Sequence, residues 1–186
     1  MSAKFKSLKG KLLLDGGKLA GSCFHRSVVL VCQHDPEGAF GLVVNRPTDK
    51  KIGEALVADL PDTLKDQVLF LGGPVQPQAL SYLHADTFLP DANVLPNLNL
   101  EHSLDGLVEL GASFSLKQQL KVFAGYAGWS PGQLDDEMKR GAWLTHPASL
   151  ELVFAADITG LWSKIVRQKG WQYRLLADQP EDLNWN

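Results

Sequence analysis

Two apolar runs give the clearest hydrophobic pattern in the chain. The first, Ser27–His34, is rich in β-branched residues, the second is Ala39–Asn45, and the sequence 35–38 separates them. Pro36 suits the second position of a type I turn and Gly38 suits the fourth. We therefore predict a buried β-hairpin over this segment.

Other short apolar runs predict further strands. They cover Lys9–Asp15, Gln67–Leu71, Leu80–His84, Asn99–His102, Leu120–Gly125 and Glu151–Ala155. The run at 67–71 is followed by Gly72-Gly73-Pro74, a sequence typical of a strand end.

A longer spacing of apolar residues predicts helices between these strands. Thr48 can cap a helix in which Ile52, Leu56 and Leu60 recur at every fourth position, before Pro61 ends it.

Two more helices are predicted later in the chain. Ser103 can cap the segment 104–110, which ends at Gly111. The segment 159–169 carries its basic residues in the last turn and ends at Gly170. Because strands pair in hairpins as well as alternate with helices, we expect an α+β fold with a mixed or antiparallel sheet.

The composition is that of an ordinary globular domain. The chain has 186 residues, 45% hydrophobic and 21% charged, so we expect a single domain over 1–186. Cys23 and Cys32 are too few for a secreted disulfide framework and suit a reducing compartment. No apolar run reaches the roughly 18 residues that span a bilayer, and the N-terminal stretch lacks the apolar core of a signal peptide. We expect a cytoplasmic protein with no membrane association.

The charge distribution does not favour direct nucleic-acid binding. The net charge of −3 divides into +3 over residues 1–60, −7 over 61–158 and +1 over 159–186. Nucleic-acid binders concentrate positive charge, because phosphate neutralisation supplies most of their non-specific affinity. The basic residues that do gather are Lys4, Lys6, Lys9 and Lys11 at the start and Lys164, Arg167 and Lys169 near the end. A solvated face or terminus explains both groups, so direct DNA binding is only our third hypothesis.

One motif resembles a catalytic one. Gly128-Trp129-Ser130-Pro131-Gly132 matches the G-x-S-x-G nucleophile elbow of α/β-hydrolases. The oxyanion hole of that fold uses the backbone N–H of the residue after the serine, which Pro131 lacks. Proline also holds Ser130 extended where a sharp turn is needed. His146, the only histidine after the serine, follows too closely for the intervening elements of that fold.

A helix start explains the same residues. Ser130 at the N-cap, Pro131 at the first helical position and Gln133 at the third form an S-x-x-Q capping box. The acidic segment 135–137 then favours the positive end of the helix dipole, and Gly141 is suited to ending the helix. We predict a capped helix here and no catalytic residue.

No cofactor or metal motif is evident. The segment 16–23 has the glycines of a phosphate loop, but Ser22 and Cys23 replace the lysine and hydroxyl that should follow. Cys32 lies in an apolar run and is expected in the core. The histidines lack the spacing of a ligand pair: they are His25, His34, His84, His102 and His146.

Two strand ends carry polar features that suggest a ligand. Asn45-Arg46 follows the hairpin, where an arginine fork can bind a carboxylate or phosphate. Gly72-Gly73 ends another strand, where glycines let backbone N–H groups approach an anion. Structural roles explain both as well, since Arg46 can pair with an internal carboxylate and the glycines can permit a tight turn.

Arg26 and Trp129 complete the set of candidate ligand-binding residues. Arg26 is the second cation that could reach an anion near the hairpin. Trp129, with Tyr126 and Trp143, suits either a core position or an aromatic platform for a ligand.

Several of these blocks resemble the YqgE/AlgH family of bacterial proteins. The similar blocks are Phe24–Pro47, Leu71–Pro77 with Leu83-His84, Gly125–Leu134 with Gly141-Ala142-Trp143, and an ending with Leu161-Trp162, Gly170 and Pro180-Glu181-Asp182-Leu183-Asn184. They span nearly the whole chain in order. One departure lies ahead of the first block, where the family often has Ala-x-Pro and an acidic residue but this chain has Asp15-Gly16-Gly17 and Gly21.

The resemblance implies a cytosolic bacterial protein with one α+β domain, in which helices flank a bifurcated or barrel-like sheet. It implies no particular reaction, and the transcriptional-regulator label of many members finds no helix-turn-helix signal here. Our leading hypothesis is a non-enzymatic regulatory or ligand-binding protein whose partner is a small anion or another protein. The alternative is a hydrolase or transferase whose fold assembles a site from Ser27, Cys23 or a histidine.

Overall fold

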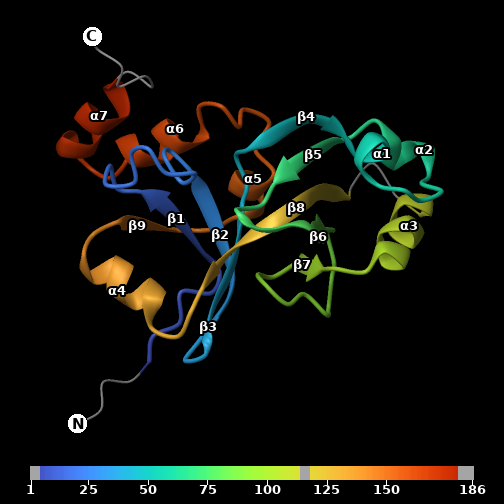
Figure 1. Cartoon of the computed structure of the whole chain (residues 1–186), viewed down its shortest axis with the longest axis horizontal. Coiled ribbons are helices and arrows are strands. Elements are labelled where there is room, and N and C mark those ends of the chain that lie inside the picture. The colour runs from blue at the N-terminus through green and yellow to red at the C-terminus, as the bar shows by residue number, and fades with distance from the viewer. Residues whose placement is uncertain (1–4, 114–117, 180–186) are drawn as a thin grey trace.

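A long strand, β8 (Gln119–Trp129), joins the two halves of the structure (Figure 1). The computed structural model describes residues 5–113 and 118–179. Within these ranges the other strands are β1 (Lys11–Asp15), β2 (Val28–Asp35), β3 (Gly38–Val43), β4 (Pro47–Lys51), β5 (Val68–Leu71), β6 (Val75–Ala85), β7 (Leu98–Glu101) and β9 (Trp143–Pro147). The helices are α1 (Ile52–Ala55), α2 (Asp62–Lys65), α3 (Leu104–Ala112), α4 (Gln133–Lys139), α5 (Leu150–Val153), α6 (Leu161–Arg167) and α7 (Trp171–Asp178).

The sheet forks at β8. One branch runs antiparallel in the order β9-β1-β2-β3-β8, and the other runs β4-β5-β8-β6-β7 with a parallel β5–β8 pair. One edge of β8 bonds to β6, while the other bonds first to β5 and then to β3. The sheet is therefore mixed, open and bifurcated, as an α+β fold of this kind requires.

Helices cover three separate surfaces of the forked sheet. Figure 1 shows α4 below the β9–β1–β2 branch, α6 and α7 above it, and α1 to α3 at the far end of the molecule. Successive side chains of β1 point to opposite faces of the sheet, so this strand contributes to two of these surfaces. Leu12 and Leu14 pack in one cluster and Leu13 in another. Both faces of β1 and β2 are buried, which explains their unbroken apolar runs.

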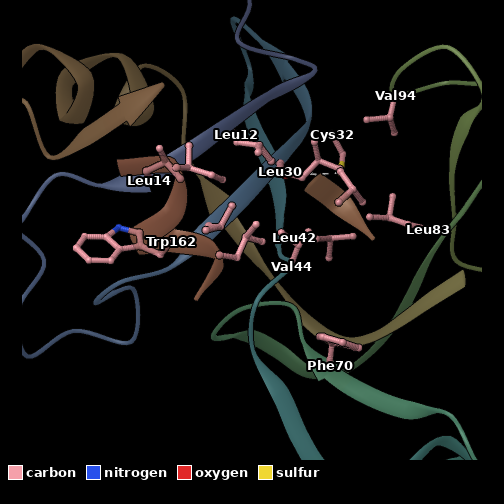
Figure 2. Close-up of a cluster of buried hydrophobic side chains, with 14 of the residues drawn as sticks. Leu12, Leu14, Leu30, Cys32, Leu42, Val44, Phe70, Leu83, Val94 and Trp162 are labelled. Atoms are coloured by element: carbon pink, nitrogen blue, oxygen red, sulfur yellow. Dashed lines mark hydrogen bonds between the residues drawn. The ribbon is translucent and has the colours of Figure 1, made fainter. Parts of the chain in front are cut away.

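The largest core cluster lies under α5, α6 and α7. Figure 2 shows Leu12, Leu30 and Leu42 in the region between Trp162 on one side and Leu83 on the other. Trp162 also donates its indole N–H to the Asp15 carbonyl at 3.1 Å, which fixes the end of β1 against α6.

Several sequence predictions are confirmed. Strands β2 and β3 form the predicted hairpin, with Asp35 opposite Gly38 across the turn. The Ser103 hydroxyl accepts the Gly106 N–H at 3.1 Å and caps α3, as expected. The predicted strands at 9–15 and 67–71 correspond to β1 and β5.

The predicted helix after Thr48 is wrong. Residues 47–51 form strand β4, and only the single turn of α1 follows. The Thr48 hydroxyl donates to the Leu69 carbonyl at 2.8 Å, so this side chain holds β4 against β5 instead of capping a helix. Tertiary pairing has overridden the helical spacing of the apolar residues.

The predicted strand at 151–155 is also wrong. The Ser149 hydroxyl accepts the Leu152 N–H at 3.3 Å and caps the short helix α5. The strand that completes this edge is β9, which the sequence pattern missed along with helices α2 and α7. Strand β9 gains its stability from β1, more than 120 positions earlier in the chain, so local sequence alone does not encode it.

Helix α4 begins later than predicted. The residue before it is Gly132 in a left-handed conformation, and Ser130 makes no side-chain cap. Half of the capping box remains, because the Gln133 side chain accepts the Ser130 N–H at 3.0 Å.

Within the described residues, no helix has the length and hydrophobicity needed to cross a membrane. Of the segments singled out in the sequence, Lys4 and the stretch 180–184 lie outside the described residues.

Candidate functional site

Three of the predicted site residues meet at a polar junction beside the loop between β1 and β2. The Asn45 side chain accepts the Val28 N–H at 2.8 Å and donates to the Arg26 carbonyl at 3.0 Å. The Arg46 guanidinium donates to the His25 carbonyl. Arg46 therefore binds backbone and not the internal carboxylate that the sequence suggested.

The carboxylate at the centre of this junction is Asp15, which sequence reasoning missed. It is fully buried and accepts backbone N–H groups from Gly17, Leu19 and Arg26, at 2.8, 3.3 and 2.9 Å. A buried carboxylate needs such donors to offset its lost hydration. The signal for it was the Asp15-Gly16-Gly17 sequence, in which Gly17 has a positive φ.

Arg26 is held in an uncommon conformation. Its φ is 52°, its guanidinium donates to the Gln179 carbonyl, and it lies 5.1 Å from the centre of the Trp162 ring. A left-handed backbone at a non-glycine residue persists only where its surroundings hold it. Here the Asp15 carboxylate and the Asn45 amide hold the backbone on both sides.

Gly72 and Gly73 lie at the fork of the sheet. The Gly72 N–H donates to the Ala124 carbonyl at 2.9 Å, and its carbonyl accepts the Val43 N–H at 2.8 Å. A Cβ atom at Gly72 would collide with the Gly125 carbonyl, and one at Gly73 with the Tyr126 backbone. Close approach of strands explains both glycines, and the Gly72 N–H is already committed to the sheet.

Trp129 lies on a different face, in the cluster under α4. Its indole N–H donates to Glu137 Oε2 at 2.9 Å, and the indole of Trp143 donates to the same oxygen at 2.7 Å. Both rings are buried, with 7% and 3% exposed. Sequence reasoning treated Glu137 only as a helix-end charge and missed this role.

These residues share no single cavity among those found in the described part of the chain. Trp129 lines a shallow hollow of about 250 Å³ beside the hairpin turn. Arg26, Asn45, Arg46, Gly72 and Gly73 line neither this hollow nor the four cavities of about 270 to 490 Å³ elsewhere in the described residues.

One concave surface is formed by two bulged strands. On β4, four residue steps from Pro47 to Lys51 lie opposite two steps on β5. On β6, five steps from Val75 to Leu80 lie opposite two steps on β8. The extra residues interrupt the regular pairing of both ladders, as β-bulges do. We call the space between them the bulge groove.

The bulge groove has a volume of about 450 Å³ and a mainly apolar lining. Its apolar residues are Ala55, Leu56, Leu69, Pro77, Ala79, Leu80, Phe123 and Ala124, and its polar ones are Thr48, Asp49, Lys50, Glu54 and Gln78. Helices α1 to α3 cover the same face of the sheet around Val122. The groove lies next to this region, where the helices no longer cover the sheet. Its size and lining fit the common pattern of small-ligand sites.

The sequence carried one signal for this groove. Proline cannot donate to a sheet ladder and is confined to edges and bulges, and both bulged segments contain one, Pro47 and Pro77. Nothing in the local pattern showed that the two segments face each other.

One serine–histidine pair lies within hydrogen-bonding distance among the described residues. Ser81 Oγ lies 2.9 Å from His102 Nδ1, but Ser81 is 1% exposed and no carboxylate orients the histidine. Ser27 donates its hydroxyl to the Phe24 carbonyl. The described residues also contain no group of three or more His, Cys, Asp or Glu able to hold a metal ion.

One ionised network lies on β6 and β7. Glu101 accepts the Tyr82 hydroxyl at 2.8 Å and the Asn99 amide at 2.9 Å, and its Oε1 lies 3.1 Å from His84 Nε2. Burial opposes its ionisation, but these contacts keep the pKa of Glu101 below its usual value. Burial and the Glu101 contact raise the pKa of Tyr82. The network joins the two strands, and the Asn99 Oδ1 atom is buried without a hydrogen-bond partner.

The comparisons with known proteins agree on one family. A family model described as AlgH-like matches residues 12–174. A UPF0301 protein of Chlorobaculum parvum is 39% identical over 187 residues, covering 97% of each chain. A UPF0301 protein of Chlorobium luteolum is 38% identical over 175 residues, covering 92% of this chain and 91% of its own.

Solved structures agree with the fold. The solution structure of the AlgH protein from Pseudomonas aeruginosa matches with a TM-score of 0.73 at 29% identity, covering 95% of this chain and 98% of that one. A crystal structure of a Corynebacterium diphtheriae protein matches with a TM-score of 0.77 at 23% identity, covering 94% of each chain, and supports the fold alone.

Proposed function

This chain belongs to the AlgH-like family, and on that premise we propose that it is a small-ligand-binding protein of the bacterial cytosol with a regulatory role. The observation that carries the proposal is the bulge groove, a concave surface of about 450 Å³ with an apolar floor and a polar rim.

The lining defines the chemistry of the ligand. Leu69, Leu80 and Ala124 provide an apolar floor, which suits a compact apolar body. Lys50 and Asp49 lie on the β4 side and Gln78 on the β6 side, so polar groups at the ends of a ligand would meet hydrogen-bond partners. We expect a molecule with a hydrocarbon or aromatic centre and polar termini.

Two variants fill the groove and test the proposal. Ala79→Trp and Ala55→Trp place an indole on opposite walls, at positions that are not fully buried. We would screen small apolar fragments that carry one polar group, using thermal shift and ligand-observed NMR. Fragments that stabilise the wild type should fail to stabilise either variant.

Ala112→Trp is the matched control, because Ala112 is exposed on α3 and does not line the groove. It should bind the fragments as the wild type does. Fragments that stabilise all four proteins equally, or an absence of any hit, would remove the groove from consideration.

The candidate anion site at Arg46, Asn45, Gly72, Gly73 and Arg26 stays a separate prediction. If an anion binds there, it must displace the Arg46 contact with the His25 carbonyl. Arg46→Lys keeps the charge but loses the fork, so it should weaken anion binding and loosen the β1–β2 loop together.

A further inference from the structure

The rim of the bulge groove carries more negative than positive charge. The charged residues that line the groove are Asp49 and Lys50 on β4 and Glu54 on α1. Two carboxylates and one ammonium give these residues a formal charge of −1. The next lysine, Lys51, does not line the groove, and its ammonium binds Asp66 at 2.6 Å. The rim therefore favours a positively charged ligand over a negatively charged one.

The three charges of the rim do not neutralise one another. Among the described residues, no ion pair within 4.0 Å includes Asp49, Lys50 or Glu54. The hydroxyl of Thr48, by contrast, already donates to the Leu69 carbonyl at 2.8 Å. A ligand in the groove would thus meet carboxylates that have no cationic partner within the protein.

Glu54 is the carboxylate that the fold already holds in position. Its Oε2 atom accepts the backbone N–H of Lys51 at 3.0 Å, at the start of α1. Its Oε1 atom has no hydrogen-bond partner among the described residues. A carboxylate that is already fixed loses little conformational freedom when it binds a ligand. Its hydrogen bond is strongest when the donor is itself charged.

Resting on the function proposed for the groove, we propose that its ligand is an organic cation, with an ammonium or guanidinium group on a hydrocarbon or aromatic body. The body lies on the floor formed by Leu69, Leu80 and Ala124, and the cationic group donates to Glu54 Oε1. Lys50 repels the cation while Glu54 attracts it, so removal of the two charges has opposite effects on binding.

Fragments that share one aromatic body test the charge of the ligand. Phenethylamine carries an ammonium, 3-phenylpropionate carries a carboxylate, and 2-phenylethanol is neutral. We would titrate each into the full-length protein at constant ionic strength and follow the backbone amide signals of the groove by NMR. The amine should bind about fivefold more tightly than the alcohol, the gain expected for one partly screened charge pair. The carboxylate should bind more weakly than the alcohol.

Charge-removing variants identify the residue that makes the selection. Glu54→Gln removes the charge but keeps an oxygen that can accept the Lys51 N–H, so it should abolish the preference for the amine and leave α1 in place. Lys50→Gln should tighten amine binding about twofold. Glu37→Gln is the matched control, because Glu37 is exposed in the hairpin turn and does not line the groove, and it should leave all the affinities unchanged.

The fragments also separate failure of this inference from failure of the proposed function. If none of them shifts the groove signals, the function proposed for the groove fails and the cationic ligand with it. If the alcohol or the carboxylate binds as tightly as the amine, the groove binds ligands without selecting a cation. That result, or a Glu54→Gln variant that still prefers the amine, overturns the assignment of a cationic ligand alone.

Discussion

Some residues of this protein have structural roles that the local sequence does not predict. Glu137 is an acidic residue on an amphipathic helix, yet its Oε2 atom accepts both Trp129 and Trp143 indole N–H groups. Gln133 contacts the other carboxylate oxygen at 3.0 Å. One carboxylate thus satisfies two buried donors and anchors α4 to the sheet.

Removal of this carboxylate should be costly. Glu137→Ala leaves two buried indole donors without an acceptor, so we expect the free energy of unfolding to fall by about 2–4 kcal/mol. Glu137→Gln keeps one acceptor oxygen and should cost less. Denaturant unfolding monitored by tryptophan fluorescence measures both, with Glu37→Ala in the exposed hairpin turn as the control. A loss no larger than that of Glu37→Ala would contradict the anchoring role.

Lys121 is the residue whose ionisation opposes folding. Its ammonium is buried, donates to the Val44 carbonyl at 2.9 Å and lies 4.6 Å from the centre of the Phe70 ring. Burial lowers the pKa of Lys121 to about 8, below the value of about 10.4 expected for the unfolded chain. Between these two values the unfolded state binds more protons, so stability gained from this group increases with pH.

A comparison with Lys121→Met isolates this effect. Below pH 8 both states of the wild type carry the charge, and the variant should be more stable by up to about 3 kcal/mol, less the lost Val44 contact. The difference should shrink between pH 8 and about pH 10. Urea unfolding of both proteins across this range provides the measurement. A difference that does not change with pH would show that Lys121 is not buried in its charged form.

At the scale of elements, the sequence predicted structure well where contacts are local. The β2–β3 hairpin is specified by its own turn and apolar runs, and the Ser103 cap by residues only three positions apart. It failed at β4 and α5, where the partner strand or the cap decided between two plausible structures. For the candidate site, Arg26, Asn45 and Arg46 do meet, but the bulge groove depends on strand registers that no local pattern reveals.

Helix α5 offers a direct test of one such correction. If residues 150–153 form a helix, Ser149→Ala removes the acceptor of the Leu152 N–H and should cost about 1 kcal/mol. Ser149→Asp restores a capping oxygen and should recover most of the loss. Thermal unfolding measures both variants. If residues 150–153 formed a strand, Ser149→Asp would not recover the stability lost in Ser149→Ala.

At the scale of the molecule, both branches of the sheet depend on β8 and on the fork beside it. Gly72 directly follows β5 and makes a backbone hydrogen bond to each neighbouring strand. Its carbonyl accepts the Val43 N–H of β3, and its N–H donates to the Ala124 carbonyl of β8. The space that a Cβ atom would need is taken by the Gly125 carbonyl and the Leu42 side chain. A larger residue at this position would therefore disturb the backbone bonds to both branches of the sheet.

Gly72→Ala should therefore loosen both branches together. We expect a loss of several kcal/mol, since backbone on neighbouring strands must move to admit the methyl group. Hydrogen exchange should then show reduced protection in β1–β2 and in β6–β7 to the same degree. Leu64→Ala is the contrasting variant, because Leu64 packs only in the cluster under α1 to α3 and should lower protection there first. If Gly72→Ala exposes one branch and leaves the other protected, the two branches unfold as separate units and the fork joins them in space without coupling their stability.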